Sequence, residues 1–170
     1  MKQLQIEGNS FDNIDFKKEI YKFTDYENCT FNNCDFSNSD LSDFKFTDCL
    51  FNTCNLSLVK LTNTAFRDVK FIDCKILGLH FENCNEFGLS IGFNNCNLSH
   101  SSFYKTKLKK IVFSNSQLHE THFTASDLSS SVFDNCDLMR ATFDNTILEK
   151  ADFRTSFNYI IDPEINSVLS

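Results

Sequence analysis

The sequence predicts an all-β solenoid with four sides, and three patterns lead to this prediction. A large apolar residue recurs every five positions along most of the chain. A small residue stands two positions before most of them, and residues i−2 and i of a short strand share one face. In the second half the large residue alternates strictly between Phe and Leu. Phe then stacks on Phe only if each coil has an even number of sides.

The composition fits one folded domain whose turns are built from Asn, Asp and Ser. The chain has 170 residues, enough for a substantial core, and its 20 Phe exclude a disordered chain. With only 4 Gly and 1 Pro, the turns must use the 19 Asn and other small polar residues. A net charge of -7 and a pI of about 5.0 argue against a general nucleic-acid binder.

Residues 1–10 are expected to form a lead-in or cap. This segment has no apolar stretch typical of a secretory signal. No apolar run in the chain approaches the roughly 20 residues that cross a bilayer. We therefore expect a cytoplasmic protein without membrane association.

The first run of repeats extends from residue 11 to residue 81 with a period of five. On a helix, five residues turn by about 500°, so successive large side chains would point in different directions around the axis and would not share one face. In a flat strand, residues i and i+5 point to opposite faces. The backbone must therefore turn a corner inside every repeat. The large positions are Phe11, Phe16, Tyr21, Tyr26, Phe31, Phe36, Leu41, Phe46, Phe51, Leu56, Leu61, Phe66, Phe71, Ile76 and Phe81.

The period breaks once, between Phe81 and Phe93. This step of twelve equals two repeats plus two extra residues, which predicts a short insertion in "NEFGLSIG", residues 85–92. Glu86 and Phe87 are expected to project from the solenoid there.

The second run extends from Phe93 to Phe153 as thirteen consecutive Phe or Leu. Eleven of the thirteen residues two positions earlier are small, so each repeat points one small and one large side chain inward. Four sides give twenty residues per coil and stacked columns of like residues. Asn95, Asn115 and Asn135 fall into one corner column, suited to an amide ladder. The predicted structural core includes Phe31, Phe51, Phe71, Phe93, Phe113, Phe133, Phe153, Leu98, Leu118 and Leu138.

The repeats resemble the pentapeptide-repeat family, whose consensus is a small residue, Asp or Asn, Leu or Phe, and two polar residues. Matching segments are "CDFSN" (34–38), "SDLSS" (126–130), "CDLMR" (136–140) and "ADFRT" (151–155). The resemblance covers residues 11–155, with 156–170 as a C-terminal tail or cap. It implies a right-handed quadrilateral β-helix of about seven coils, a rod of roughly 35 Å.

All eight cysteines fall in the small position, which predicts small buried hydrophobic groups. Zinc sites favour CxxC-like pairs, and the sequence has none. Stacked cysteines such as Cys34, Cys54 and Cys74 would lie near disulfide distance, but a cytosolic setting keeps them reduced. The cysteines are Cys29, Cys34, Cys49, Cys54, Cys74, Cys84, Cys96 and Cys136.

The sequence predicts no enzyme, no metal site and no cofactor. "HETHF" (119–123) resembles a metal-binding motif only superficially, because that motif requires a helix. His80, His100, His119 and His122 are therefore interpreted as solvated corner residues. We find no glycine-rich phosphate loop, no serine nucleophile setting and no convergent carboxylate pair, and a filled solenoid leaves no cavity for one.

Function is therefore expected at the outer surface, where charge is banded along the chain. Residues 23–56 hold six acids and one base, residues 57–119 four acids and eight bases, and residues 120–152 seven acids and two bases. The four-sided register places Asp15 beside Asp35 and Asp48 beside Asp68. These stacked carboxylates, with Glu86 and Phe87, are the candidate interaction surface.

The resemblance extends to the quinolone-resistance and microcin-immunity type of pentapeptide-repeat protein. That type is thought to imitate duplex DNA and to bind DNA gyrase or topoisomerase IV, so a partner of this kind is implied, with possible protection from fluoroquinolones and without direct nucleic-acid binding. The tail "FNYIIDPEINSVLS" (157–170) is similar to the end of that group's solenoid. It leaves no room for the dimerising helix that usually follows, so we expect a monomer or weak dimer.

Two other functions fit the same pattern. The first is a rigid scaffold or regulatory interaction module without a topoisomerase role. The second is a cell-envelope or membrane-associated accessory protein, which the absence of an anchor disfavours.

Overall fold

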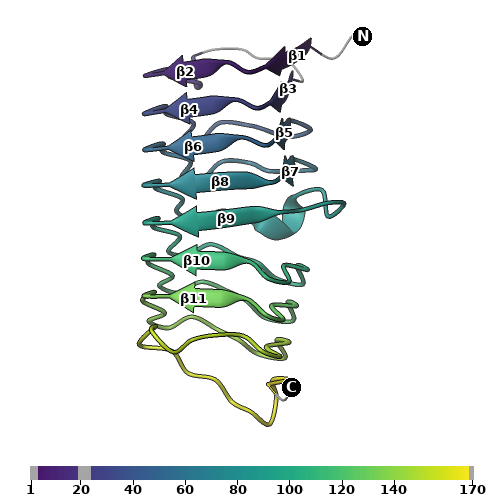
Figure 1. Cartoon of the computed structure of the whole chain (residues 1–170), viewed down its shortest axis with the longest axis vertical. Coiled ribbons are helices and arrows are strands. Elements are labelled where there is room, and N and C mark those ends of the chain that lie inside the picture. Colours follow the sequence, from purple (N-terminus) through teal and green to yellow (C-terminus); the bar gives the residue numbers. More distant parts are fainter. Residues whose placement is uncertain (1–3, 19–23, 169–170) are drawn as a thin grey trace.

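The structure, a computed structural model, is a parallel β-solenoid that describes residues 4–18 and 24–168 (Figure 1). Tyr21 and Phe23 lie outside the described residues. Within the described part the one helical element is the short 3-10 helix η1 (Phe81–Asn83). No helix there is long and apolar enough to span a membrane.

The strands form two parallel sheets on adjacent sides of the coil. One sheet has the order β1-β3-β5-β7, and the other has the order β11-β10-β9-β8-β6-β4-β2. The strands are β1 (Leu4–Glu7), β2 (Ser10–Asp12), β3 (Thr24–Glu27), β4 (Thr30–Asn32), β5 (Lys45–Thr47), β6 (Leu50–Asn52), β7 (Ala65–Arg67), β8 (Val69–Ile72), β9 (Ile91–Asn94), β10 (Val112–Ser114) and β11 (Val132–Asp134).

The register confirms a coil of twenty residues with four sides. In the longer sheet Phe31 pairs with Phe11 and with Phe51. The other two sides carry isolated parallel bridges with the same spacing, such as Asp35 to Asn55 and Asp40 to Lys60. The all-β solenoid prediction is therefore confirmed, while the right-handed turn and the count of about seven coils stay predictions.

The spacing changes to twenty-two residues where the insertion lies. Phe71 pairs with Phe93, and Lys75 pairs with Asn97. The two extra residues are taken up after η1, in a loop that projects from the side of the rod (Figure 1). The β1-β3-β5-β7 sheet ends above this loop, whereas the longer sheet continues through β9, β10 and β11.

Stacked aromatic rings fill the interior. Eight Phe form one continuous column from Phe11 to Phe153, with centroid distances between stacked neighbours of 4.5 to 5.4 Å. A second column runs from Phe81 through Phe103 and Phe123 to Phe143. All ten residues of the predicted core are at most 9% exposed. Offset stacking adds to the free energy gained by burying these rings.

Most corners have a left-handed backbone at the position two residues after the large one, here called the corner position. Among the described residues, twenty-four other than Gly have φ between 51° and 65°, and ten of them are Asn and four are Asp. This conformation costs about 1–2 kcal/mol for most residues and less for Asn or Asp. The requirement explains how the chain turns so often with so few Gly.

The amide ladder predicted at one corner is partly as expected. Asn135 donates a hydrogen bond from Nδ2 to Oδ1 of Asn115 at 2.9 Å. Asn115 donates to Asn94 instead of Asn95, and Asn95 donates to Asp73 at 2.6 Å. A corner Asp therefore accepts the hydrogen bond that the Asn of the next coil donates, and the ladder continues through Asn–Asp pairs.

The C-terminal tail covers the end of the solenoid and forms ladder hydrogen bonds with the last coil. Ser167 bridges Ile147 with the twenty-residue spacing, and its carbonyl accepts from the Leu148 N–H at 2.7 Å. Buried Asn166 accepts the Thr146 N–H through Oδ1 at 2.9 Å. These bonds satisfy polar groups that would otherwise be unpaired at the end of the last coil.

We predict that Phe113→Ala lowers the free energy of unfolding by about 3–5 kcal/mol, because it leaves a cavity in the middle of the Phe column. Phe113 is 0% exposed and stacks between Phe93 and Phe133. Urea unfolding measures the effect. Phe87→Ala is the control, since Phe87 is 78% exposed. Equal losses for the two variants would contradict the register.

We predict that Thr53→Asn raises the free energy of unfolding by about 1 kcal/mol. Thr53 is β-branched at a corner with φ 56°, and it interrupts a column in which Asn33 donates to Asn13 at 2.6 Å. The reverse change, Asn33→Thr, should lower stability by a similar amount. Thermal unfolding tests both, and a stabilising Asn33→Thr would contradict the strain argument.

Candidate functional site

Acidic residues at two positions of the repeat behave differently. Those one residue before the large position, here called the outward position, fold back onto their own turn. Asp35 and Asp127 each accept a backbone N–H from two residues further on, at 2.9 and 3.1 Å. Asp40, Asp137 and Asp152 make the same turn. Carboxylates at the outward position therefore stabilise the coil itself.

The structure places Asp15 and Asp35 side by side on adjacent coils and neutralises both. Lys17 Nζ lies 2.7 Å from Asp35 Oδ2, and Lys18 Nζ lies 3.2 Å from Asp15 Oδ2. Burial opposes ionisation of Asp35, but hydrogen bonds from Lys17 and Ser37 outweigh it and hold the pKa of Asp35 at about 2. This pair is charged at neutral pH, yet two lysines balance it, which weakens it as an anionic contact.

Acidic residues at the corner position do not accept a backbone N–H from their own turn in this way. Asp48 and Asp68 are exposed and lie on adjacent coils, because the register of β5 and β7 continues from Thr47 beside Arg67. Neither has a cationic side chain within ion-pair distance in the described part of the chain. Asp68 accepts a hydrogen bond from Ser90 at 3.0 Å.

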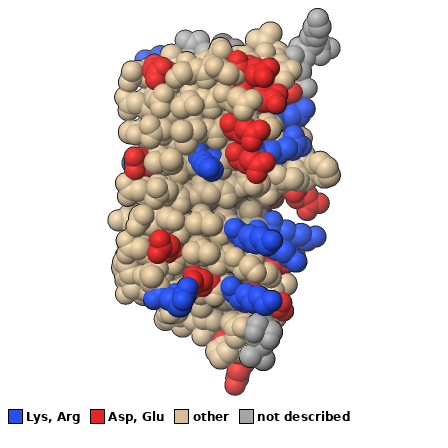
Figure 2. Space-filling view, viewed as in Figure 1, with Lys and Arg blue, Asp and Glu red and all other residues tan. Residues whose placement is uncertain are grey.

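Glu27 lies on the coil above Asp48, beside this column and not in it, because Glu27 pairs with Thr47. Glu27 accepts a hydrogen bond from Gln5 at 3.0 Å and also has no ion-pair partner in the described ranges. We call Glu27, Asp48 and Asp68 the acidic edge. Figure 2 shows acidic side chains gathered along this edge of the rod, above the loop. Asp48 and Asp68 lie one coil apart, about 4.8 Å, whereas Glu27 is one coil above Thr47, the residue before Asp48.

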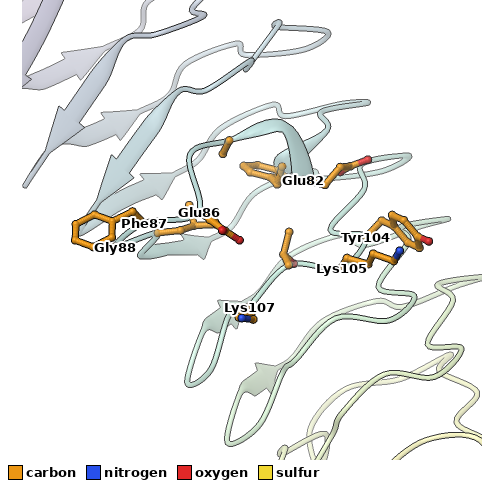
Figure 3. A pocket seen from close by; sticks show the side chains of 11 residues that line it. Glu82, Glu86, Phe87, Gly88, Tyr104, Lys105 and Lys107 are labelled. Atoms are coloured by element: carbon orange, nitrogen blue, oxygen red, sulfur yellow. The ribbon is translucent and has the colours of Figure 1, made fainter.

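The projecting loop forms one wall of a pocket of about 590 Å³ (Figure 3). Phe87 lines the pocket from the loop and is 78% exposed, and the Arg67 guanidinium lies 5.8 Å from its ring centroid. Glu86 points toward the opposite wall, which contains Tyr104, Lys105 and Lys107. The predicted projection of Glu86 and Phe87 therefore corresponds to an exposed loop that also shapes a pocket.

Four lysines gather on the coil below the loop, and Figure 2 shows a basic patch there. Lys109 lies 3.4 Å from Asp127, and Lys105 lies over the Tyr104 ring at 5.1 Å. Lys107 and Lys110 have no acidic side chain within ion-pair distance among the described residues. We call Lys105, Lys107, Lys109 and Lys110 the basic coil. The acidic edge and the basic coil thus lie on opposite sides of the loop.

The eight cysteines are free and buried, and burial raises the pKa of several of them. Burial raises the pKa of Cys34 and Cys136 to about 11, and that of Cys49 and Cys84 to about 12. The thiolate is the reactive form, so these groups are poor nucleophiles at neutral pH. Most of the thiols donate weak hydrogen bonds to carbonyls of the coil above, as Cys54 does to Phe31 at 3.2 Å.

The histidines lie at corners and on the sides of coils, each near a polar partner. His119 Nε2 lies 2.7 Å from Asp137 Oδ2, and His80 Nδ1 lies 3.1 Å from Glu82 Oε1. His122 contacts Thr142 at 3.1 Å. Among residues 4–18 and 24–168, no group of three or more His, Cys, Asp or Glu is arranged to hold a metal ion.

Sequence reasoning missed the pocket and did not distinguish the two groups of acids. The insertion was visible in the spacing, but the cavity depends on where the loop backbone goes. The difference between Asp35 and Asp48 was available from the repeat, because an Asp before the large residue can make an Asx turn and one after it cannot.

Comparisons with known proteins agree with the fold. A family model described as "Pentapeptide repeat region" matches residues 24–87 and 89–157. Trypsin-treated QnrB1, a plasmid-mediated fluoroquinolone resistance protein, is 21% identical with a TM-score of 0.56, over 99% of this chain and 90% of that chain. Full-length QnrB1 is 23% identical with a TM-score of 0.53, over 97% and 91%. No curated protein sequence matches significantly.

We predict that Ellman's reagent detects few thiols in the native protein and all eight after denaturation. The expected result follows from the burial of all eight thiols, which excludes the reagent, and from the raised pKa of Cys34, Cys49, Cys84 and Cys136. Absorbance after mixing, with and without guanidinium, gives both numbers. Rapid labelling of most thiols in the native state would place the small position on the outside of the coil.

Proposed function

The chain belongs to the pentapeptide-repeat family, and on this premise we propose that it is a non-enzymatic interaction protein that binds DNA gyrase or topoisomerase IV. Its acidic edge would occupy the groove that otherwise holds duplex DNA. The proposal extends to protection from fluoroquinolones, because QnrB1 is described as a fluoroquinolone resistance protein. We place this action in the cytoplasm.

The acidic edge is the observation that carries the proposal. Asp48 and Asp68 are stacked carboxylates on a rigid rod, and Glu27 lies beside their column on the coil above; none of the three has an ion-pair partner in the described part of the chain. Duplex DNA is likewise a rod with regularly spaced negative charge, and proteins that bind it present Lys and Arg to the phosphates. A basic groove would therefore attract this edge and would not require any particular base sequence.

The same surface limits the orientation of the partner. The basic coil lies below the loop and would be repelled by a basic groove. Contact is therefore expected over the coils that carry the acidic edge, with Phe87 at the border. Phe87 and the Arg67 side chain beneath it would add apolar and cationic contacts beyond the groove.

A rigid scaffold is the second candidate, and a different surface favours it. The outer face of the longer sheet is flat and carries few charges over its central strands (Figure 2). A shallow hollow of about 430 Å³ lies over Gly92, between Lys70 and Val112. Such a face suits a permanent protein contact that does not depend on charge.

We predict that Asp48→Lys with Asp68→Lys weakens binding to gyrase by about tenfold or more, because it reverses the charge of the edge. The fold should tolerate both changes, since Lys105, Lys110 and Lys150 occupy the same corner conformation in the native chain. Surface plasmon resonance with immobilised gyrase measures binding. Wild-type affinity should also fall as salt rises.

Asp144→Lys with Glu164→Lys is the matched control. It makes the same change in net charge at exposed positions away from the acidic edge. A supercoiling assay with and without a fluoroquinolone tests the consequence for the enzyme. If micromolar wild-type protein neither binds gyrase nor changes supercoiling, the topoisomerase proposal is wrong and the scaffold function takes its place.

A further inference from the structure

Among the described residues, one junction between coils lacks the backbone hydrogen bonds that join the two junctions below it on the same side of the rod. At the junction below the basic coil, three N–H groups donate across it. Asp127 donates to Thr106, Leu108 to Asp127 and Lys110 to Ser129, each at 2.9 Å. The next junction repeats this pattern, with distances of 2.8 to 2.9 Å.

At the junction above the basic coil, the corresponding groups are unpaired. The N–H and C=O of Lys107 and the C=O of Lys109 have no backbone partner among the described residues. The loop that should provide these partners bonds elsewhere. Ser90 N–H donates upward to Phe66 O at 3.0 Å, and Phe87 N–H donates to Asn85 Oδ1 at 3.0 Å.

The pocket opens at this unpaired edge. Thr106 and Lys107 form one wall, and the loop residues Glu86 to Leu89 form another (Figure 3). Buried Phe81 and Cys84 give it an apolar floor. Its volume of about 590 Å³ falls within the roughly 300–1,000 Å³ typical of ligand pockets.

We infer that this pocket binds a short extended peptide with alternating acidic and apolar residues, which adds a β-strand to the edge at Lys107. An unpaired strand edge is a template for another chain, and main-chain bonds provide the affinity in such complexes. The three free groups of Lys107 and Lys109 are spaced as in every other junction of the solenoid.

The charges around the pocket and the alternation of side chains along a strand determine which peptide fits. In a strand, successive side chains point to opposite faces. Side chains that face outward would lie next to Lys107 and Lys109 below, with Arg67 above, so acidic residues fit there. Side chains that face inward would meet Phe81 and Leu89, so apolar residues fit there. Glu82 and Glu86 on the loop wall disfavour a second acidic face.

This inference does not depend on binding to gyrase, and its experiment uses no topoisomerase. The probe is a fluorescein-labelled, end-capped peptide of alternating Glu and Val, five residues long. Protein is added to this peptide up to about 1 mM, and fluorescence anisotropy measures binding. Saturable binding is expected. The same peptide with N-methylated Val should bind about tenfold more weakly, because it cannot donate to the edge carbonyls. A Lys and Val peptide should not bind.

Amide hydrogen exchange on the wild type locates the site. The Lys107 amide should exchange at least tenfold faster than the Asp127 amide, which is bonded to Thr106 at 2.9 Å. Adding the Glu and Val peptide should slow exchange at Lys107 only. Protection of Lys107 in the free protein would show that the loop closes the edge, and the inference would fail.

Charge reversal provides the last comparison. Lys107→Glu should weaken peptide binding by about tenfold, whereas Lys150→Glu, two coils away, should leave it unchanged. No binding by the wild type at 1 mM overturns the inference. Equal binding of the N-methylated peptide also overturns it, because attraction between charges alone would then explain the result.

Discussion

The structure depends on one constraint, which is that each coil must return to the same place, after twenty residues in the regular coils and after twenty-two at the insertion. Only then can parallel ladders form on every side, and only then does each Phe stack on the Phe of the next coil. The ladder and the aromatic columns have the same repeat, about 4.8 Å, so the register that satisfies the backbone also fills the interior. A slip of one residue would turn every Phe outward.

Most polar residues in the repeat serve this constraint. Asp and Asn at the outward position hold the turn by accepting a backbone N–H, as Asn97 does from Ser99 at 3.1 Å. Small residues such as Thr146 donate a buried hydroxyl to a carbonyl of the coil above, at 2.8 Å. Asn and Asp at corners reduce the cost of a left-handed backbone. These three structural roles account for the many Asn, Asp and small polar residues in the chain.

The surfaces that remain free for function are therefore few. Asp48 and Asp68 lie at corners, where their carboxylates hold no turn, and Glu27 lies beside their column on the coil above. The loop after η1 is the second free feature, since two extra residues move its backbone away from the ladder. It leaves Lys107 with an unpaired edge beside a pocket. Both features lie on the side of the rod where the shorter sheet ends.

The sequence by itself determined the four-sided coil, the inward Phe columns and the site of the insertion. Each follows from a strict period, because Phe113 can only meet Phe93 and Phe133 if twenty residues close a coil. Only the tertiary structure decided which carboxylates are neutralised, since the reach of Lys17 to Asp35 depends on side-chain positions on neighbouring coils. It also decided that the loop forms no ladder bonds with Lys107. The sequence shows that the loop is two residues longer than a regular repeat, but this length does not determine the path of the loop backbone.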